Sequence, residues 1–347
     1  MKNASSLSAI SLPANARQLQ LCREQAVWSG SEVSIEGLRM PRGPFLVTIL
    51  LFISLVPSRL RAQDTANPSQ RNSPEVAKLI ESAATGDPVA ELSLARRYRL
   101  GLGLPRDYSQ AATWYAAAAK QGLPAAQFEL GYMYENGQGL PRDYSRAAEL
   151  YRAAAEQGHA TAANNLATMY NHGLGVPKSV ADSLKWRRIS AQAGDPMGQC
   201  DLASMYFTGR GVRRNYEEAA RWFRAAAEQG LPAAQHDLGV MYFNGTGVPL
   251  DYFEAAKWTA RAAEQGDARA KTELGYLYEQ GKGVPLDYTL AYMWYSLGAQ
   301  EGDSRAIKLM KNLSGRMTSK QLAQANSRAD ARVAERRGAV ESPADRR

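Results

Sequence analysis

The chain has 347 residues, of which 45% are hydrophobic and 22% charged, and these values are ordinary for a folded soluble protein. Its net charge of +8 comes from the two ends, because residues 87–302 hold 22 basic and 23 acidic residues. Nucleic-acid binding needs a basic face on the folded part of the chain, so the charge distribution argues against a nucleic-acid partner. The two cysteines, Cys22 and Cys200, lie in different segments and cannot form a disulfide framework.

The N-terminal segment has the pattern of an export signal. Residues 1–39 are polar and without sustained periodicity, and we expect a disordered extension that precedes the true start at Met40. A basic residue, the apolar run Phe45–Val56 and a cleavage-site pattern ending at Ala62 then follow. The run is shorter than the ~20 apolar residues of a membrane-spanning helix. The pattern predicts a signal peptide over 40–62 and a periplasmic or secreted protein without stable membrane insertion; an uncleaved anchor is the alternative.

A polar linker and a first helix connect this signal to the rest of the chain. Residues 63–73 are rich in turn-forming residues, which predicts a linker. Ser73 can cap a helix, and Pro74 suits the first helical position. We therefore expect an N-terminal capping helix over 74–86 that covers the first complete repeat.

Glycine then recurs every 36 residues from Gly86 to Gly302, with no insertion between the units. A fixed period of this size is typical of a solenoid. The six units are 87–122, 123–158, 159–194, 195–230, 231–266 and 267–302. Positions within a unit are numbered below from 1 to 36.

Each unit predicts two helices. Alanine at position 4, leucine at position 8 and tyrosine at position 12 share one side of the first helix. A Gly-x-Gly pair at positions 15 and 17 ends that helix, because glycine readily takes positive φ. The second helix begins after Asp or Asn at position 21 in five units, and the third unit departs with Ser179-Val180. At position 28 we expect buried tryptophans: Trp114, Trp186, Trp222, Trp258 and Trp294.

Beyond Gly302, half a unit and a last helix close the array. Thr318 and Gln321 form a capping box, which predicts a helix to about Glu335. A solenoid must close its apolar end with an atypical, more polar element. We therefore expect capping helices over 303–337 and a disordered tail over 338–347.

The pattern A-x-x-x-L-G-x-x-Y-x-x-G-x-G-V/L-x-x-D-Y-x-x-A-x-x-W-Y-x-x-A-A-x-x-G is nearly complete at Ala126–Gly158 and Ala234–Gly266. It resembles the Sel1-like repeat family, a relative of the tetratricopeptide repeats, over 87–302. The resemblance implies an all-α fold, a right-handed α/α solenoid of helix-turn-helix pairs with six repeats plus capping helices. It also implies a non-enzymatic scaffold for protein–protein interaction, with bacterial roles such as restraining a sensor kinase or organising exopolysaccharide assembly.

No residue pattern indicates catalysis, a metal or a cofactor. The Gly-x-Gly pairs lack the preceding strand and following Lys-Ser/Thr of a phosphate loop. His159, His172 and His236 are scattered, and we expect the first two to be solvated loop residues. Some Sel1-like proteins that bind β-lactams carry a cysteine pair in each repeat, and those pairs are absent here.

The residues that vary between units predict a binding surface. Positions 6, 10 and 13 of the first helix vary freely and share one side, which lines the concave surface in solenoids of this type. Exposed aromatic residues there suit protein capture. The candidate partner-binding residues are Phe128, Tyr132, Glu135, Asn164, Thr168, Asn171, Ser204, Phe207, His236, Val240, Phe243, Tyr276 and Glu279. The alternative for Phe207 and Phe243 is packing against adjacent turns.

Position 7 is mostly acidic or amide, and we expect it to be a solvated edge. The residues are Glu129, Asn165, Asp201, Asp237 and Glu273. The sequence therefore predicts a monomer that binds a protein partner on the concave face of the solenoid, in the bacterial envelope. The alternatives are a carbohydrate-binding module, with the same aromatic rings as stacking platforms, and a β-lactam-binding hydrolase.

Overall fold

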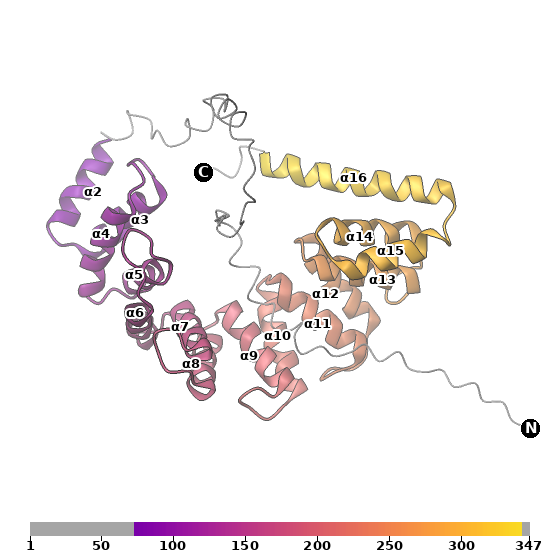
Figure 1. Ribbon diagram of the computed structural model, residues 1–347, viewed down its shortest axis with the longest axis horizontal. Helices are drawn as coiled ribbons and strands as arrows, with labels where there is room; N and C mark the ends of the chain where they lie inside the picture. The colour runs from indigo at the N-terminus through magenta and orange to yellow at the C-terminus, as the bar shows by residue number, and fades with distance from the viewer. Residues whose placement is uncertain (1–72, 342–347) are drawn as a thin grey trace, which may run out of the picture. The chain divides into compact units, whose positions relative to one another are not determined.

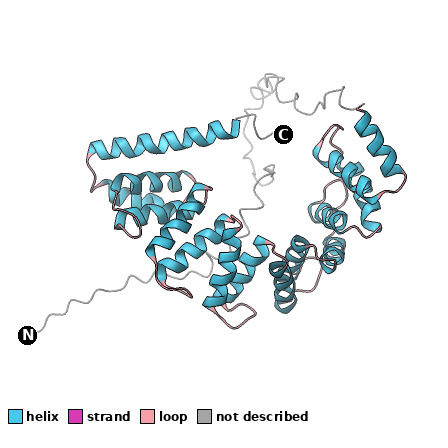
Figure 2. Cartoon of the chain, turned by 180° about the vertical axis from the view of Figure 1, so that it is seen from behind, coloured by secondary structure: helices cyan, strands magenta, loops and turns pink. Residues whose placement is uncertain are grey.

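The computed structural model describes residues 73–341, which contain fifteen α-helices and no strand (Figures 1 and 2). The described residues belong to two compact units, 73–193 and 194–341, called here the N-terminal and C-terminal units. The predicted extension over 1–39, the signal peptide over 40–62 and all but the last residue of the linker over 63–73 lie outside this range. The all-α architecture predicted for the repeats is confirmed.

The N-terminal unit consists of a single helix followed by three helical hairpins. Its helices are α2 (Pro74–Ala84), α3 (Pro88–Leu100), α4 (Tyr108–Lys120), α5 (Pro124–Asn136), α6 (Tyr144–Glu156), α7 (Ala160–His172) and α8 (Val180–Gln192). The two helices of each hairpin pack together, and α4 packs on α5 as α6 packs on α7. The helix α2 covers α3, as expected for a capping helix.

The C-terminal unit repeats this arrangement and ends in two further helices. Its helices are α9 (Pro196–Thr208), α10 (Tyr216–Glu228), α11 (Pro232–Asn244), α12 (Tyr252–Glu264), α13 (Ala268–Gln280), α14 (Tyr288–Gln300), α15 (Ser304–Ser314) and α16 (Ser319–Glu341). Both α15 and α16 pack against α14, so they cover the last hairpin.

Helix boundaries follow the capping residues that the sequence predicts. Asp107 accepts a hydrogen bond from the backbone N–H of Gln110 at 3.0 Å and starts α4. In the third repeat, where the sequence departs from the Asp or Asn pattern, Ser179 still caps α8 by accepting from the backbone N–H of Asp182. Each first helix of a repeat ends at a left-handed glycine, for example Gly101 with φ +74°. The backbone N–H of Asp107 then donates to the carbonyl of Tyr98 at 2.9 Å, and this bond recurs in every repeat. Local chemistry therefore sets the ends of most helices, whereas α5 and α11 begin after leucines that make no side-chain capping bond.

The core is built from alanine, leucine and one aromatic position that the sequence analysis missed. The alanines at position 4 and the leucines at position 8 are buried. Trp186, Trp258 and Trp294 are buried as predicted, whereas Trp114 and Trp222 are only half-buried. The residue after the tryptophan, at position 29, lies deeper, and four of these side chains are fully buried: Tyr115, Tyr151, Phe223 and Tyr295.

A polar pair joins the two helices of five repeats. Gln157 donates from its side chain to that of Gln127 at 2.9 Å, and positions 35 and 5 pair likewise in the first, fourth and fifth repeats. In the sixth repeat the pair is the ammonium of Lys271 with Glu301. In the third repeat both positions are alanine, so donor and acceptor are lost together. Such matched loss is expected because a single buried polar partner would be left unsatisfied.

The last helix extends beyond its predicted end. Thr318 and Gln321 form the predicted capping box, with reciprocal backbone-to-side-chain bonds of 2.9 and 3.3 Å. Arg332 lies 4.6 Å from the ring of Trp294, which holds α16 on the last hairpin. The helix continues to Glu341, so residues 338–341 are helical and the predicted disordered tail cannot start at residue 338. Alanine, arginine and glutamate before Pro343 favour this continuation.

Within residues 73–341, no helix combines the length and the apolar character required to cross a bilayer.

Candidate functional site

The predicted binding residues lie on the first helices of the repeats, and the surface that they form on each unit is called here the groove face of that unit. It comprises positions 6, 10 and 13 of α3, α5 and α7 in the N-terminal unit and of α9, α11 and α13 in the C-terminal unit. Tyr132 is 37% exposed, and the other aromatic residues of this face are half-buried: Phe128, Phe207, Phe243 and Tyr276. Solvent therefore reaches part of every predicted aromatic ring.

Four predicted binding residues are instead buried. Asn164, Thr168 and Asn171 on α7, and His236 on α11, are each no more than 8% exposed. Among them, the His236 ring contacts the Asp237 carboxylate at 3.1 Å, and the Asn171 amide contacts the His172 ring at 3.1 Å. These four side chains therefore do not present the accessible surface that the sequence analysis expected of them, and their contact with a partner stays a prediction.

In the N-terminal unit the groove face is organised around Phe128. Its ring stacks on that of His159 at a centroid distance of 4.6 Å and lies 5.8 Å from Tyr151. His159 is the N-cap of α7, because its Nδ1 accepts the backbone N–H of Ala162 at 3.2 Å. The expectation that His159 is a solvated loop residue is therefore wrong, since its ring both caps a helix and supports Phe128.

In the C-terminal unit the groove face carries an aromatic cluster with a cation above it. The ring of Phe243 lies 5.4 Å from Tyr252 and 6.0 Å from Tyr276. The Nζ of Lys282 lies 4.8, 4.9 and 6.0 Å from the centroids of Phe243, Tyr252 and Tyr276. Phe207 makes the corresponding ring contact with Tyr216 at 5.2 Å. Both phenylalanines thus pack beside the start of the second helix, as the alternative reading expected, and remain partly accessible.

Where position 13 holds a glutamate, its carboxylate accepts a hydrogen bond from the buried tyrosine of the same repeat. The Tyr151 hydroxyl donates to Glu135 at 2.6 Å, and the Tyr295 hydroxyl donates to Glu279 at 2.7 Å. Burial, and then the neighbouring carboxylate, raise the pKa of both phenols above the usual value. These tyrosines therefore stay protonated and act as hydrogen-bond donors within the fold.

The acidic residues at position 7 do not form a solvated edge. Asp201 and Asp237 are buried, and Asp237 contacts the His236 ring at 3.1 Å. Glu129 lies 3.6 Å from the Arg99 guanidinium, and Glu273 forms an ion pair with an arginine of α15. The expectation failed because these side chains are buried or pair with a charged or polar neighbour, which lies in the preceding repeat for Glu129 and on the following helix α15 for Glu273.

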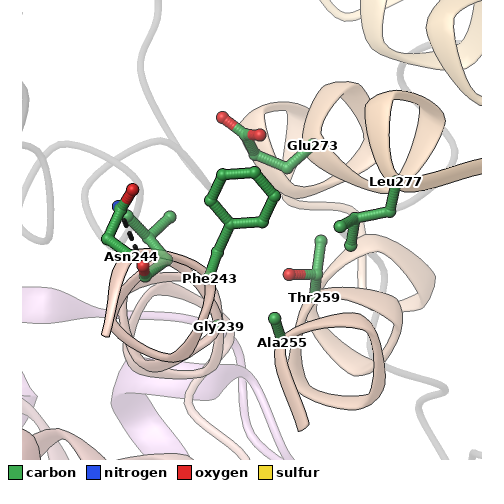
Figure 3. A pocket seen from close by; sticks show the side chains of 8 residues that line it. Gly239, Phe243, Asn244, Ala255, Thr259, Glu273 and Leu277 are labelled. Carbon is green, nitrogen blue, oxygen red and sulfur yellow. Dashed lines mark hydrogen bonds between the residues drawn. The ribbon is translucent and has the colours of Figure 1, made fainter. Parts of the chain in front are cut away.

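One pocket opens on the groove face between α11 and α13, with α12 at its base (Figure 3). The hollow is shallow, and the space of about 290 Å³ between its lining residues includes the open solvent at its mouth. The floor is made of the small residues Gly239, Ala255 and Thr259, and the walls include Phe243. The Glu273 carboxylate lies at the rim (Figure 3). The pocket is thus apolar inside, with one negative group at its edge.

The described residues contain no group of three or more His, Cys, Asp or Glu side chains that could hold a metal ion. Cys200 is buried in the core of the C-terminal unit.

Comparison with known proteins supports the repeat pattern. The model of the Sel1 repeat matches residues 88–123, 124–159, 160–195, 196–231, 232–267 and 268–303. The crystal structure of a Sel1 repeat protein from Oxalobacter formigenes is 36% identical with a TM-score of 0.61, and the match covers 68% of each chain. No protein with a curated description matches the chain.

Two other solved structures are more distant. The antigen c5321 of uropathogenic Escherichia coli is 27% identical with a TM-score of 0.40, over 74% of this chain and 79% of that chain. An immunity protein of Pseudomonas aeruginosa is 20% identical with a TM-score of 0.41, over 62% of this chain and 83% of that chain.

Proposed function

The chain belongs to the Sel1 repeat family, and on that premise we propose that it is a non-enzymatic scaffold that binds a partner protein on its groove face. Sel1 repeat solenoids generally mediate protein–protein interaction. The observation that carries the proposal is that each unit has partly accessible aromatic residues at the positions where the repeats differ from one another.

The ring contacts favour a protein partner because they fix the rings before binding. Phe128 is stacked on His159, and Phe243 is held between two tyrosines. A side chain that is already ordered loses less conformational entropy when a partner covers it. Aromatic residues with this property are the usual energetic centres of protein interfaces.

The cellular setting in the proposal is the bacterial envelope. Its support is the export pattern from Met40, in which a basic residue precedes the apolar run Phe45–Val56. A partner there would belong to signalling or polysaccharide machinery, such as a sensor kinase or an exopolysaccharide assembly protein.

Substitutions on the groove face test the proposal. After a partner is identified by crosslinking in the native host, we expect Tyr132→Ala and Tyr276→Ala each to weaken its affinity about tenfold, as measured by biolayer interferometry. Phe253→Ala is the matched control, because Phe253 is an aromatic residue 67% exposed on the second helix α12. The circular dichroism of all three variants should match that of the wild type.

Unchanged affinity in both groove-face variants would contradict the proposal, and so would a loss confined to Phe253→Ala. A glycan that binds the wild type and not Tyr132→Ala, with no protein partner captured, would instead favour the carbohydrate-binding alternative.

A further inference from the structure

The pocket in the fifth repeat exists because one large side chain is missing. Position 29 holds Tyr115, Tyr151, Arg187, Phe223 and Tyr295 in the other five repeats. Tyrosine or phenylalanine at this position is fully buried and fills the space between the two helices of its repeat and the next. In the fifth repeat the residue is Thr259, whose side chain fills only the inner part of that space.

The fifth repeat nevertheless keeps the glycine that admits a ring. In the second repeat a Cβ on Gly131 would lie 3.0 Å from the ring of Tyr151, and in the sixth repeat a Cβ on Gly275 would lie 2.7 Å from that of Tyr295. Repeats with Tyr115 or Phe223 at position 29 have alanine at position 9. Gly239 occupies position 9 in the fifth repeat, where a Cβ would lie 2.6 Å from the Thr259 hydroxyl and 3.2 Å from the backbone oxygen of Ala255 and the backbone nitrogen of Thr259, with no ring beside it.

A carboxylate also lies at the pocket, where it could accept a hydrogen bond from the hydroxyl of a bound phenol. The hydroxyls of Tyr151 and Tyr295 donate to Glu135 and Glu279 from position 13 of the same repeat. In the fifth repeat position 13 is Phe243, and the carboxylate at the rim is Glu273 from the next repeat (Figure 3). In the first two repeats a position-7 residue of the following repeat likewise interacts with the buried tyrosine: Glu129 interacts electrostatically with Tyr115, and Asn165 forms a side-chain hydrogen bond with Tyr151.

We propose that this pocket binds the side chain of one tyrosine of the partner protein, with its ring over Gly239 and Thr259 and its hydroxyl donating to Glu273. The inference rests on the proposed function, because it takes the groove face as the binding surface. The partner would supply in this repeat the ring that other repeats supply themselves. Burying an aromatic anchor in a preformed pocket is the arrangement that gives interface hot spots.

The lining distinguishes this occupant from two others. A purely apolar side chain would leave the rim carboxylate without a new hydrogen bond. A lysine would meet Glu273, but that carboxylate already pairs with Arg305, and Lys282 lies against the Phe243 wall. A tyrosine ring would pack on the apolar floor, and its neutral hydroxyl would donate a hydrogen bond to the Glu273 carboxylate, whose charge Arg305 partly neutralises.

A titration with p-cresol, the side-chain analogue of tyrosine, tests the pocket without any partner. We expect saturable chemical-shift changes of Thr259 and Leu277 in methyl NMR spectra, with a dissociation constant on the order of 1 mM. Toluene and n-butylammonium should bind at least fivefold more weakly. Glu273→Gln should weaken p-cresol about fivefold and leave toluene unchanged.

Thr259→Tyr should remove p-cresol binding and reduce partner affinity at least tenfold, because the protein's own ring then fills the pocket. Thr259→Val, which leaves the pocket unfilled, should retain both p-cresol binding and partner affinity. Thr259→Phe, which has the side chain of the fourth repeat, serves if Thr259→Tyr does not fold.

Absence of saturable p-cresol binding, or equal binding to Thr259→Tyr, would overturn the inference. Toluene binding as tightly as p-cresol would overturn the assignment to tyrosine. If p-cresol fails while Tyr132→Ala still weakens partner capture, this inference falls and the proposed function stands. If p-cresol binds but no groove-face variant affects capture, the proposed function falls, and the partner tyrosine falls with it.

Discussion

Gly283→Ala is expected to lower the free energy of unfolding by about 4 kcal/mol, one of the largest losses available to a single methyl group in this chain. Gly283 has φ +68°, and a Cβ there would overlap the backbone carbonyl of Tyr252 at the start of α12. Tyr252 is the first residue of α12, and the loop that holds Gly283 is fixed between α13 and α14, so neither backbone can easily move away. The cost therefore combines left-handed strain of about 1–2 kcal/mol with a steric clash that side-chain motion cannot relieve.

Gly281→Ala is the matched control, two residues earlier in the same loop. Gly281 has nearly the same φ, +63°, but its nearest contact for a Cβ is the Leu286 side chain at 3.2 Å. We expect a loss of about 1–2 kcal/mol from the backbone strain alone. Urea unfolding followed by circular dichroism measures both variants. Equal losses would contradict the claim that the second glycine is needed for close approach between repeats.

Tyr151→Thr is expected to cost about 3–5 kcal/mol and to create in the second repeat the pocket that the fifth repeat already has. Tyr151 is fully buried, its ring lies over Gly131, and its hydroxyl bonds to Glu135. Threonine would leave a cavity over that glycine and remove the donor to Glu135.

The cavity can be refilled in a controlled background. In Thr259→Tyr protein, where the native pocket is filled, 5 mM p-cresol should restore about 1 kcal/mol to Tyr151→Thr and nothing to its parent, if the ligand binds with a dissociation constant of about 1 mM. Tyr144→Thr, at a half-buried tyrosine, is the control and should lose about 1 kcal/mol. A loss below 1 kcal/mol for Tyr151→Thr would show that position 29 does not support the repeat.

The helix boundaries could be predicted from the sequence because their causes are local. Asp107, Ser179 and Thr318 cap helices through their own side chains, and Gly101 ends a helix by its own backbone conformation. Such signals need only a few neighbouring residues. The end of α16 was misjudged because it has no strong stop before Pro343.

The contacts between helices were harder to predict because they join positions about 16 or 30 residues apart. The pairing of Tyr151 with Glu135 was missed, although a charged residue at position 13 accompanies each tyrosine at position 29. The polar pair at positions 5 and 35 left a similar trace, since Ala163 and Ala193 replace both partners together. Comparing pairs of positions across the six repeats would have revealed both.

The groove face was predicted only in part for the same reason. Helical periodicity tells which side of the first helix a residue occupies. The exposure of that residue depends also on the size of the side chains around it. His236 is buried against Asp237, whereas Tyr132 extends into solvent. The predicted aromatic residues of the groove face all keep some exposure, whereas four of the predicted polar residues are buried.

Site-specific photocrosslinking in the native host tests most directly whether the groove face is the working surface. Benzoylphenylalanine would be placed at Tyr132 and Val240 on that face, and at the exposed Thr113 and Arg261 on second helices. We predict one protein adduct of defined mass from the first two positions and none from the others. Adducts only from Thr113 or Arg261 would contradict the account.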